Sequence, residues 1–147
     1  MLAPLHKETA AILGVSPAAR AATPLGFAAL VRKGLPARAV RNVVVHVSAG
    51  YPDEAANLQS FIVPAGTYKR RLAQGRLSPE ESEKAVRFAR VMATAEHVLG
   101  DADEARHFLH EPHAELEGRR PIEVAETEIG AREVEALLWK AFYGVPT

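Results

Sequence analysis

Residues 64–82 read PAGTYKRRLAQGRLSPEES, and this stretch decides the fold because it holds the end of one helix and the start of the next. Pro64 suits the first position of a helix, where its missing amide hydrogen is not needed, and Gly75 is typical of a residue that ends one. Ser78 has the features of an N-cap, with Pro79 after it and Glu81 in place to complete a capping box. The stretch therefore predicts a short basic helix over 64–75 and a second helix that begins after Ser78.

Helix signals of the same kind recur on both sides of this stretch. Upstream, Pro24 starts and Gly34 ends one predicted helix, and Asp53 can cap another. Downstream, apolar residues at i, i+4, i+7 and i+11 from Phe88 indicate one long helix that ends at Gly100. We expect further helices over 101–110, 121–127 and 129–143.

The segment over 37–50, ARAVRNVVVHVSAG, is ambiguous. Its valines are β-branched, which favours a strand on propensity. Four of them, however, follow the i, i+3, i+4, i+7 spacing of one helix face: Val40, Val43, Val44 and Val47. We interpret the segment as a helix, so the predicted fold class is all-α with seven or eight helices. For residues 1–23, a short helix and a mobile arm both remain open.

The composition is that of a globular protein, with 48% apolar and 24% charged residues. The chain has no cysteine, which excludes disulfides and thiolate chemistry. It has no run of about 18 apolar residues that would cross a membrane, and its first residues lack the basic start of a signal peptide. We therefore expect a cytoplasmic protein with no membrane partner.

The net charge of zero conceals two halves of opposite sign. Residues 1–77 hold 10 Lys or Arg and 3 Asp or Glu, whereas residues 78–147 hold 8 and 15. The first half therefore carries +7 and the second half −7. Such asymmetry indicates two partners, one of them anionic, or simply two solvated faces of one compact domain.

The predicted helix over 64–75 has two distinct faces, because successive residues are rotated by about 100°. One face carries Thr67, Arg70, Arg71 and Gln74. The opposite face, which we expect to pack inward, carries Ala65, Tyr68 and Leu72. Arginine pairs with guanine or phosphate, and glutamine pairs with adenine, so the polar face suits DNA. Together with the preceding short helix, it has the outline of a helix-turn-helix; the alternative is an ordinary solvated face.

Three histidines, His107, His110 and His113, are spaced three residues apart and raise the question of a zinc site. Pro112 turns the chain between the second and the third, so we expect solvated or capping histidines and no metal. The chain has no nucleophile elbow, phosphate-binding glycine loop, HExxH motif or dinucleotide fingerprint. We therefore expect no enzyme and no cofactor.

Three aromatic residues stand near the C-terminus: Trp139, Phe142 and Tyr143. Aromatic side chains bury large areas and often anchor interfaces. We expect a partner surface here, with at least one of the three completing the protein's own core.

Several segments together resemble the Xre/MbcA/ParS class of bacterial antitoxins over about residues 24–147. They are TYKRR (67–71), RLSPEESEK (76–84), RFARVMATAEHVLGD (87–101) and TEIGAREVEALLWKAFYGV (127–145), with Ala105, Phe108-Leu109, Pro112-His113, Leu116-Glu117-Gly118 and Pro121 between the last two. Three positions depart from the usual pattern of the class: Phe108 replaces Trp, His113 replaces Asn and Glu117 replaces Gly.

The resemblance implies a two-part protein behind an N-terminal extension over 1–23. An Xre-like helix-turn-helix domain over 24–84 would bind the operator of its own operon, usually as a homodimer. A helical domain over 85–147 would bind a RES-type toxin, which consumes NAD⁺, and cover its active site. The DNA contacts implied are Thr67, Lys69, Arg70, Arg71, Gln74 and Arg76. The toxin contacts implied are Trp139, Phe142, Tyr143, Gly144, Val145, Pro146 and Thr147.

An alternative is a stand-alone helix-turn-helix transcription regulator whose C-terminal domain binds another protein or only dimerises. The charge pattern fits the antitoxin interpretation, because a toxin cleft that binds an anionic dinucleotide is expected to be electropositive and would complement the acidic half.

Overall fold

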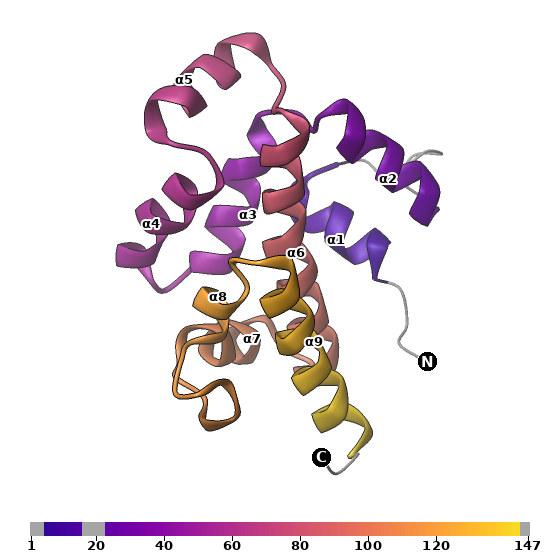
Figure 1. The fold of residues 1–147 in the computed structure, drawn as a ribbon, viewed down its shortest axis with the longest axis vertical. Coiled ribbons are helices and arrows are strands. Elements are labelled where there is room, and N and C mark those ends of the chain that lie inside the picture. Colours follow the sequence, from indigo (N-terminus) through magenta and orange to yellow (C-terminus); the bar gives the residue numbers. More distant parts are fainter. Residues whose placement is uncertain (1–4, 16–22, 145–147) are drawn as a thin grey trace.

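The computed structural model describes residues 5–15 and 23–144, and this part of the chain is all-α, as the sequence predicts. The helices surround one long central helix (Figure 1). In chain order they are α1 (His6–Leu13), α2 (Pro24–Lys33), α3 (Arg38–Ser48), α4 (Pro52–Ile62), α5 (Ala65–Gln74), α6 (Pro79–Leu99), α7 (Ala102–His110), the short 3-10 helix η1 (Ala114–Leu116), α8 (Pro121–Val124) and α9 (Glu128–Tyr143). None of the described helices is long and apolar enough to span a membrane.

The central helix α6 joins the two halves of the chain (Figure 1). It begins with the predicted capping box: the Glu81 amide donates to Ser78 Oγ at 3.1 Å, and the Ser78 amide donates to Glu81 Oε1 at 2.9 Å. Its predicted apolar stripe is buried at Phe88, Met92 and Ala95, whereas Leu99 at the end of the stripe is exposed. Helices α1, α2, α3, α7 and α9 all pack against it, so both halves share one core.

Helix α3 confirms the helical interpretation of the valine-rich segment. Val40, Val43, Val44 and Val47 are buried, whereas Arg41 and Val45, on the other side of the helix, are exposed. The helical period thus places the four valines on one face, where they pack on α1, α4 and α6. The burial of this face outweighs the strand propensity of β-branched residues.

The N-terminal segment contains a helix within its described residues. Ala10 and Leu13 of α1 are fully buried in the core, and α1 packs on α2, α3 and α6. The Asn42 side chain donates to the Leu13 carbonyl at 3.0 Å and holds the end of α1 against α3. Residues 1–4 and 16–22 of this segment lie outside the described part.

Two predicted helix starts are displaced by one or two residues. Asp53 does not cap α4, because Tyr51 is the N-cap and Pro52 is the first helical residue; the Asp53 carboxylate lies in the first turn, where it favours the helix dipole. Pro64 precedes α5 as its N-cap instead of opening the helix. Thr127, which the sequence places at the end of the predicted helix over 121–127, lies beyond α8 and instead caps α9 by accepting the Gly130 amide at 3.0 Å.

Candidate functional site

Helices α4 and α5 are separated only by Val63 and Pro64 and have the outline of the helix-turn-helix that the sequence predicts. Helix α4 is anchored through Leu58 and Ile62, both buried. Helix α5 contains no buried residue, and it extends from one end of the molecule (Figure 1). Such an uncovered second helix is free to enter the major groove of DNA.

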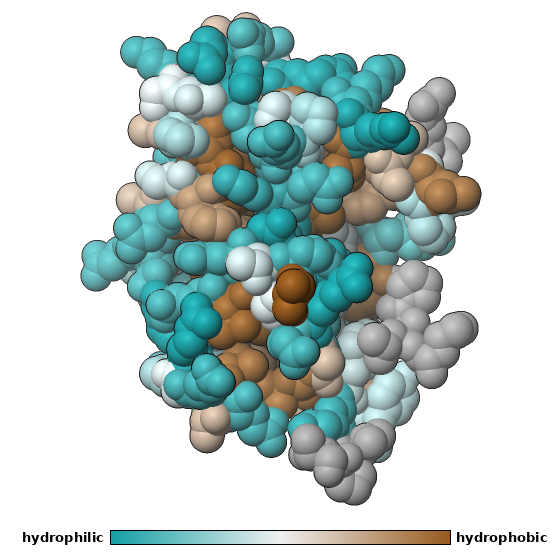
Figure 2. Space-filling model, viewed as in Figure 1, coloured by the Kyte–Doolittle hydropathy of each residue, from teal (hydrophilic) through white to brown (hydrophobic). Residues whose placement is uncertain are grey.

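The outer surface of α5 is polar and basic. Lys69, Arg70 and Gln74 are exposed and Thr67 is half-buried. Figure 2 shows mainly hydrophilic residues over this end of the molecule. The expected inward face is wrong in part, because Ala65 is exposed and Leu72 is 50% exposed, while only Tyr68 packs against the core.

The guanidinium of Arg71 is not free, contrary to the expectation that Arg70 and Arg71 are both exposed and available for DNA. Its Nε and Nη2 donate to the two carboxylate oxygens of Glu81 at 2.8 and 3.2 Å, and its Nη1 donates to Gln74 Oε1 at 3.2 Å. Burial acts to raise the pKa of Glu81, but the hydrogen bonds from Arg71 and Ser78 and the charge of Arg71 outweigh it and hold this pKa below its ordinary value. The carboxylate is therefore ionised at neutral pH and remains paired.

Arg76 lies where the chain leaves α5 and pairs with the segment between α2 and α3. The Leu77 amide donates to the Leu35 carbonyl at 2.8 Å, and the guanidinium of Arg76 donates to the Gly34 carbonyl at 2.9 Å. Gly34 has φ 102°, and a Cβ there would overlap the Leu77 carbonyl oxygen, so this close approach requires glycine. The pairing holds the C-terminal end of α5 near the start of α3.

The basic residues of the two halves differ in their partners. Among the described lysines and arginines of residues 5–77, Arg71 alone is in an ion pair with a carboxylate. In the second half, ion pairs are formed by Arg87, Arg90, Arg106, Arg120, Arg132 and Lys140. The cations around α5 are therefore available for an external anion, and most of those in the acidic half are not.

The C-terminal aromatic residues divide into one buried and two exposed side chains. Trp139 is 5% exposed and packs against Leu5 and Ala93. Phe142 and Tyr143 are 48% and 52% exposed, and their rings contact each other and Trp139. Trp139 thus completes the core, and Phe142 and Tyr143 present aromatic surface. Val145, Pro146 and Thr147 lie outside the described residues.

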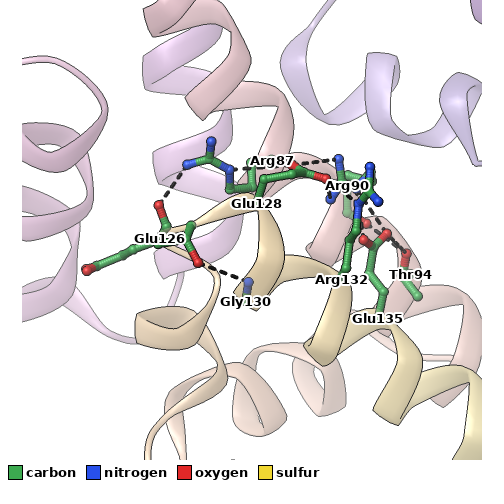
Figure 3. A network of polar contacts seen from close by, with 9 residues as sticks. Arg87, Arg90, Thr94, Glu126, Glu128, Gly130, Arg132 and Glu135 are labelled. Carbon is green, nitrogen blue, oxygen red and sulfur yellow. Dashed lines mark hydrogen bonds and ion pairs between the residues drawn. The ribbon is translucent and has the colours of Figure 1, made fainter.

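A polar network joins the N-terminal half of α9 to α6 (Figure 3). Arg90 donates to both carboxylate oxygens of Glu135 at 3.0 and 3.1 Å and to Glu128 at 2.9 and 3.3 Å. Arg132 also donates to Glu128 at 3.1 Å. Burial raises the pKa of Glu135 although Arg90 opposes this, whereas for Glu128 the contacts with Arg90 and Arg132 outweigh burial and lower the pKa. The sequence shows no local signal for the contacts of Arg90, because its partners Glu128 and Glu135 are 38 and 45 residues away.

The loop between α7 and α8 contains two of the three departures from the usual pattern of the class, His113 and Glu117. His113 Nδ1 accepts the Glu115 amide at 3.2 Å and so caps η1, a role that the amide oxygen of an asparagine can also fill. Glu117 has φ 60°, in the left-handed region that glycine adopts most easily. Both residues therefore occupy positions where the usual Asn and Gly have a local backbone role.

The three histidines lie in different surroundings. His110 is buried, with Nε2 3.0 Å from the Val47 carbonyl and its ring stacked on Tyr51 at 4.1 Å. His107 is exposed, and His113 faces its own loop. Within the described ranges, no group of three or more His, Cys, Asp or Glu side chains is arranged to hold a metal ion.

Comparisons with known proteins match both halves of the chain. The family described as antitoxin Xre-like helix-turn-helix domain matches residues 26–90, and the antitoxin Xre/MbcA/ParS C-terminal toxin-binding domain matches residues 94–144. A curated protein named Antitoxin Xre, from Yersinia enterocolitica serotype O:8 / biotype 1B, is 37% identical over 103 residues, which cover 69% of each chain. Another Antitoxin Xre, from Pseudomonas putida, is 33% identical over 78 residues, which cover 52% of this chain and 49% of the relative. The chain therefore belongs to the Xre antitoxin family, with a DNA-binding helix-turn-helix domain followed by a toxin-binding domain.

Proposed function

We propose that this antitoxin represses its own operon as a homodimer through α5 and neutralises a RES-type, NAD⁺-degrading toxin by covering its active site with the C-terminal region. The main support is the arrangement of exposed groups at opposite ends of α6. Cations without carboxylate partners lie on α5 and directly after it, and exposed aromatic side chains lie at the end of α9. Both activities consist of binding, and neither requires catalysis by the chain itself.

On the DNA side, Arg70 is the residue to which we assign the largest contribution. It is exposed on α5, and no carboxylate pairs with its guanidinium. A free guanidinium can contact a guanine edge or a phosphate with two hydrogen bonds. Thr67, Lys69 and Gln74 share the exposed surface of α5, and Arg76 follows the helix directly. Two copies would present two such helices to two half-sites.

The DNA assignment is tested with Arg70→Ala on the promoter fragment of the operon that encodes the chain. Affinity should fall by about ten- to a hundredfold, and the slope of log K against log salt should become shallower by about one. Arg119→Ala is a matched control, because Arg119 is also exposed but lies in the loop before α8. Equal binding by wild type and Arg70→Ala across the salt titration would reject α5 as the DNA-binding helix.

On the toxin side, Phe142 and Tyr143 are the proposed direct contacts, and Trp139 supports them from the core. Half-exposed aromatic rings at the end of a helix are typical anchors of a protein interface. The surrounding half of the chain is acidic, which complements an electropositive cleft in the toxin. Gly144 ends α9 with φ 64°, in the left-handed region. The segment Val145-Pro146-Thr147 is assigned to the toxin interface from the family resemblance.

The toxin assignment is tested with the double substitution Phe142→Ser and Tyr143→Ser. Cells that express the toxin with this variant should lose NAD⁺, and toxin affinity should fall by about tenfold or more. Ile129→Ser is the matched control, since Ile129 is an exposed apolar residue at the opposite end of α9. Full protection by the double variant would place the interface elsewhere, and co-purification of a partner of another class would favour the stand-alone regulator.

A further inference from the structure

We propose that Glu81, an acidic residue at the start of α6, positions the DNA-reading helix α5 through its pair with Arg71. The proposal rests on the proposed function of α5. It assigns Arg71 to positioning within the protein, not to contact with DNA. It also implies that a negative charge close to the DNA surface strengthens specific binding instead of weakening it.

The first observation is that few other contacts determine the orientation of α5, apart from the pairing of residues 75–77 with the segment between α2 and α3 at its C-terminal end. It contributes no buried residue to the core, and Tyr68 is its one apolar side chain packed against the core cluster. A recognition helix must nevertheless be placed to within roughly half an ångström for its side chains to meet base edges. Some other contact must therefore restrict the rotation of α5 about its own axis.

The Arg71–Glu81 pair has the geometry for this task. Two nitrogens of one guanidinium donate to two oxygens of one carboxylate, at 2.8 and 3.2 Å, which determines the direction as well as the distance of the contact. The side chains are 23% and 13% exposed, so the pair is partly shielded from water. Because Arg70 is adjacent to Arg71 on the helix, anything that holds Arg71 also sets the direction of Arg70.

The Glu81 side chain is itself firmly held. Its Oε1 accepts the Ser78 amide at 2.9 Å as part of the capping box of α6. One turn into α6, the fully buried Ser82 hydroxyl donates to the Ser78 carbonyl at 2.8 Å and accepts the Leu35 amide at 2.8 Å. The pair therefore connects the exposed helix α5 to the most extensively packed helix of the protein.

The proposal predicts that removing the Glu81 charge changes operator affinity in the direction opposite to that expected from electrostatic repulsion alone. DNA phosphates repel a nearby carboxylate, so removing its charge should strengthen binding to every DNA if Glu81 has no other role. If Glu81 positions α5, removing the charge should weaken binding to the operator while binding to unrelated DNA stays equal or becomes tighter. The ratio of the two affinities separates these outcomes.

The test compares Glu81→Gln with Glu80→Gln in the full chain. Glutamine at position 81 keeps the capping box, since Glu and Gln both serve at that position, but removes the charge that holds Arg71. Glu80 is the exposed neighbour, and no ion pair holds it in the structure. The probes are the operon's promoter fragment and a shuffled duplex of equal length and composition, each titrated with salt.

For Glu81→Gln we expect the affinity for the promoter fragment to fall by about five- to tenfold, with the shuffled duplex bound at least as tightly as by wild type. Glu80→Gln should bind both duplexes equally well or slightly more tightly. Amide hydrogen exchange in α5 should become faster in Glu81→Gln alone, a change that does not depend on DNA. Tighter binding of both duplexes by both variants, with unchanged exchange, would overturn the proposal.

Arg71→Ala provides a second test, and Arg70→Ala separates the proposal from the proposed function. Arg71→Ala should weaken promoter binding without changing the salt slope, whereas Arg70→Ala should reduce the slope by about one. An equal loss of slope in both variants would show that Arg71 contacts phosphate and would reject the positioning role. Unchanged promoter binding by Arg70→Ala would reject the DNA-binding role of α5 itself.

Discussion

Helices α5 and α9 are attached to the same central helix by different means. Helix α9 buries Val134, Leu138 and Trp139, and the Arg90 network joins it to α6. Helix α5 buries no residue, and its contact with α6 is made through the Arg71–Glu81 pair. The difference indicates that the proposed toxin-binding end is built on the core, whereas the proposed DNA-binding helix is left uncovered with little packing.

The largest expected effect is on α9, the helix that packs on the core. Trp139→Ala should lower the free energy of unfolding by about 3–5 kcal/mol, because the buried indole packs on Leu5 and Ala93 and its loss leaves a cavity. Urea denaturation followed by circular dichroism measures this. Phe142→Ala, which removes a half-exposed ring of the same cluster, should cost clearly less. Equal losses would show that the division into buried and exposed aromatic residues is wrong.

Removing Arg90 should have the next largest effect. Arg90→Ala leaves the Glu135 carboxylate without its main partner, and we expect a loss of about 1–3 kcal/mol in the free energy of unfolding. Adding Glu135→Gln to this variant should restore part of the loss, because the half-buried charge is then removed as well. Arg70→Ala on α5 should change stability by less than about 0.5 kcal/mol. A similar loss at both positions would contradict the comparison.

The junction between the halves should respond to pH through His110. Burial lowers the pKa of His110; the hydrogen bond to the Val47 carbonyl and the charges of Glu54 and Glu111 oppose this shift, and Arg120 reinforces it. The unfolded chain therefore takes up the proton first as the pH falls, so stability should decrease as the pH drops below about 6.5. His110→Gln should show a smaller decrease between pH 7.5 and 5.5 in urea denaturation. An identical pH dependence in both proteins would exclude His110 as its source.

The smallest effect is expected on α5. Leu72→Ser should change the free energy of unfolding by less than about 0.5 kcal/mol, because the Leu72 side chain is already half in water. Thermal denaturation of the variant beside Leu138→Ser, which alters a buried position of α9, provides the contrast. A large loss from Leu72→Ser would show that α5 contributes to the core after all.

The sequence allows most of the fold to be predicted, because its helix boundaries depend on local chemistry. Ser78 with Glu81 at the start of α6 and Gly100 at its end both have the predicted role. The family assignment is also confirmed, through motifs that lie along the chain. Local signals of this kind can be read from the sequence without knowledge of the tertiary structure.

The site is less predictable, because its decisive contacts join residues that are distant in sequence or on different elements. Nothing in the letters Arg70-Arg71 distinguishes a free guanidinium from a paired one; only the packing of α5 against the start of α6 does so. Trp139 is buried by Leu5, from the opposite end of the chain. The inward packing expected of Leu72 fails for the same reason, because helical spacing defines a face but not what covers it.

The length of α6 has a geometric consequence for the whole molecule. Its 21 residues, at about 1.5 Å each, make a rod of roughly 31 Å between the α5 end and the α9 end. A rod of this kind sets the rotational phase as well as the spacing of what it carries, since each inserted residue would turn one end by about 100° relative to the other. If the two proposed surfaces are correct, the same helix would hold them apart and would orient a protein bound at one end relative to DNA bound at the other.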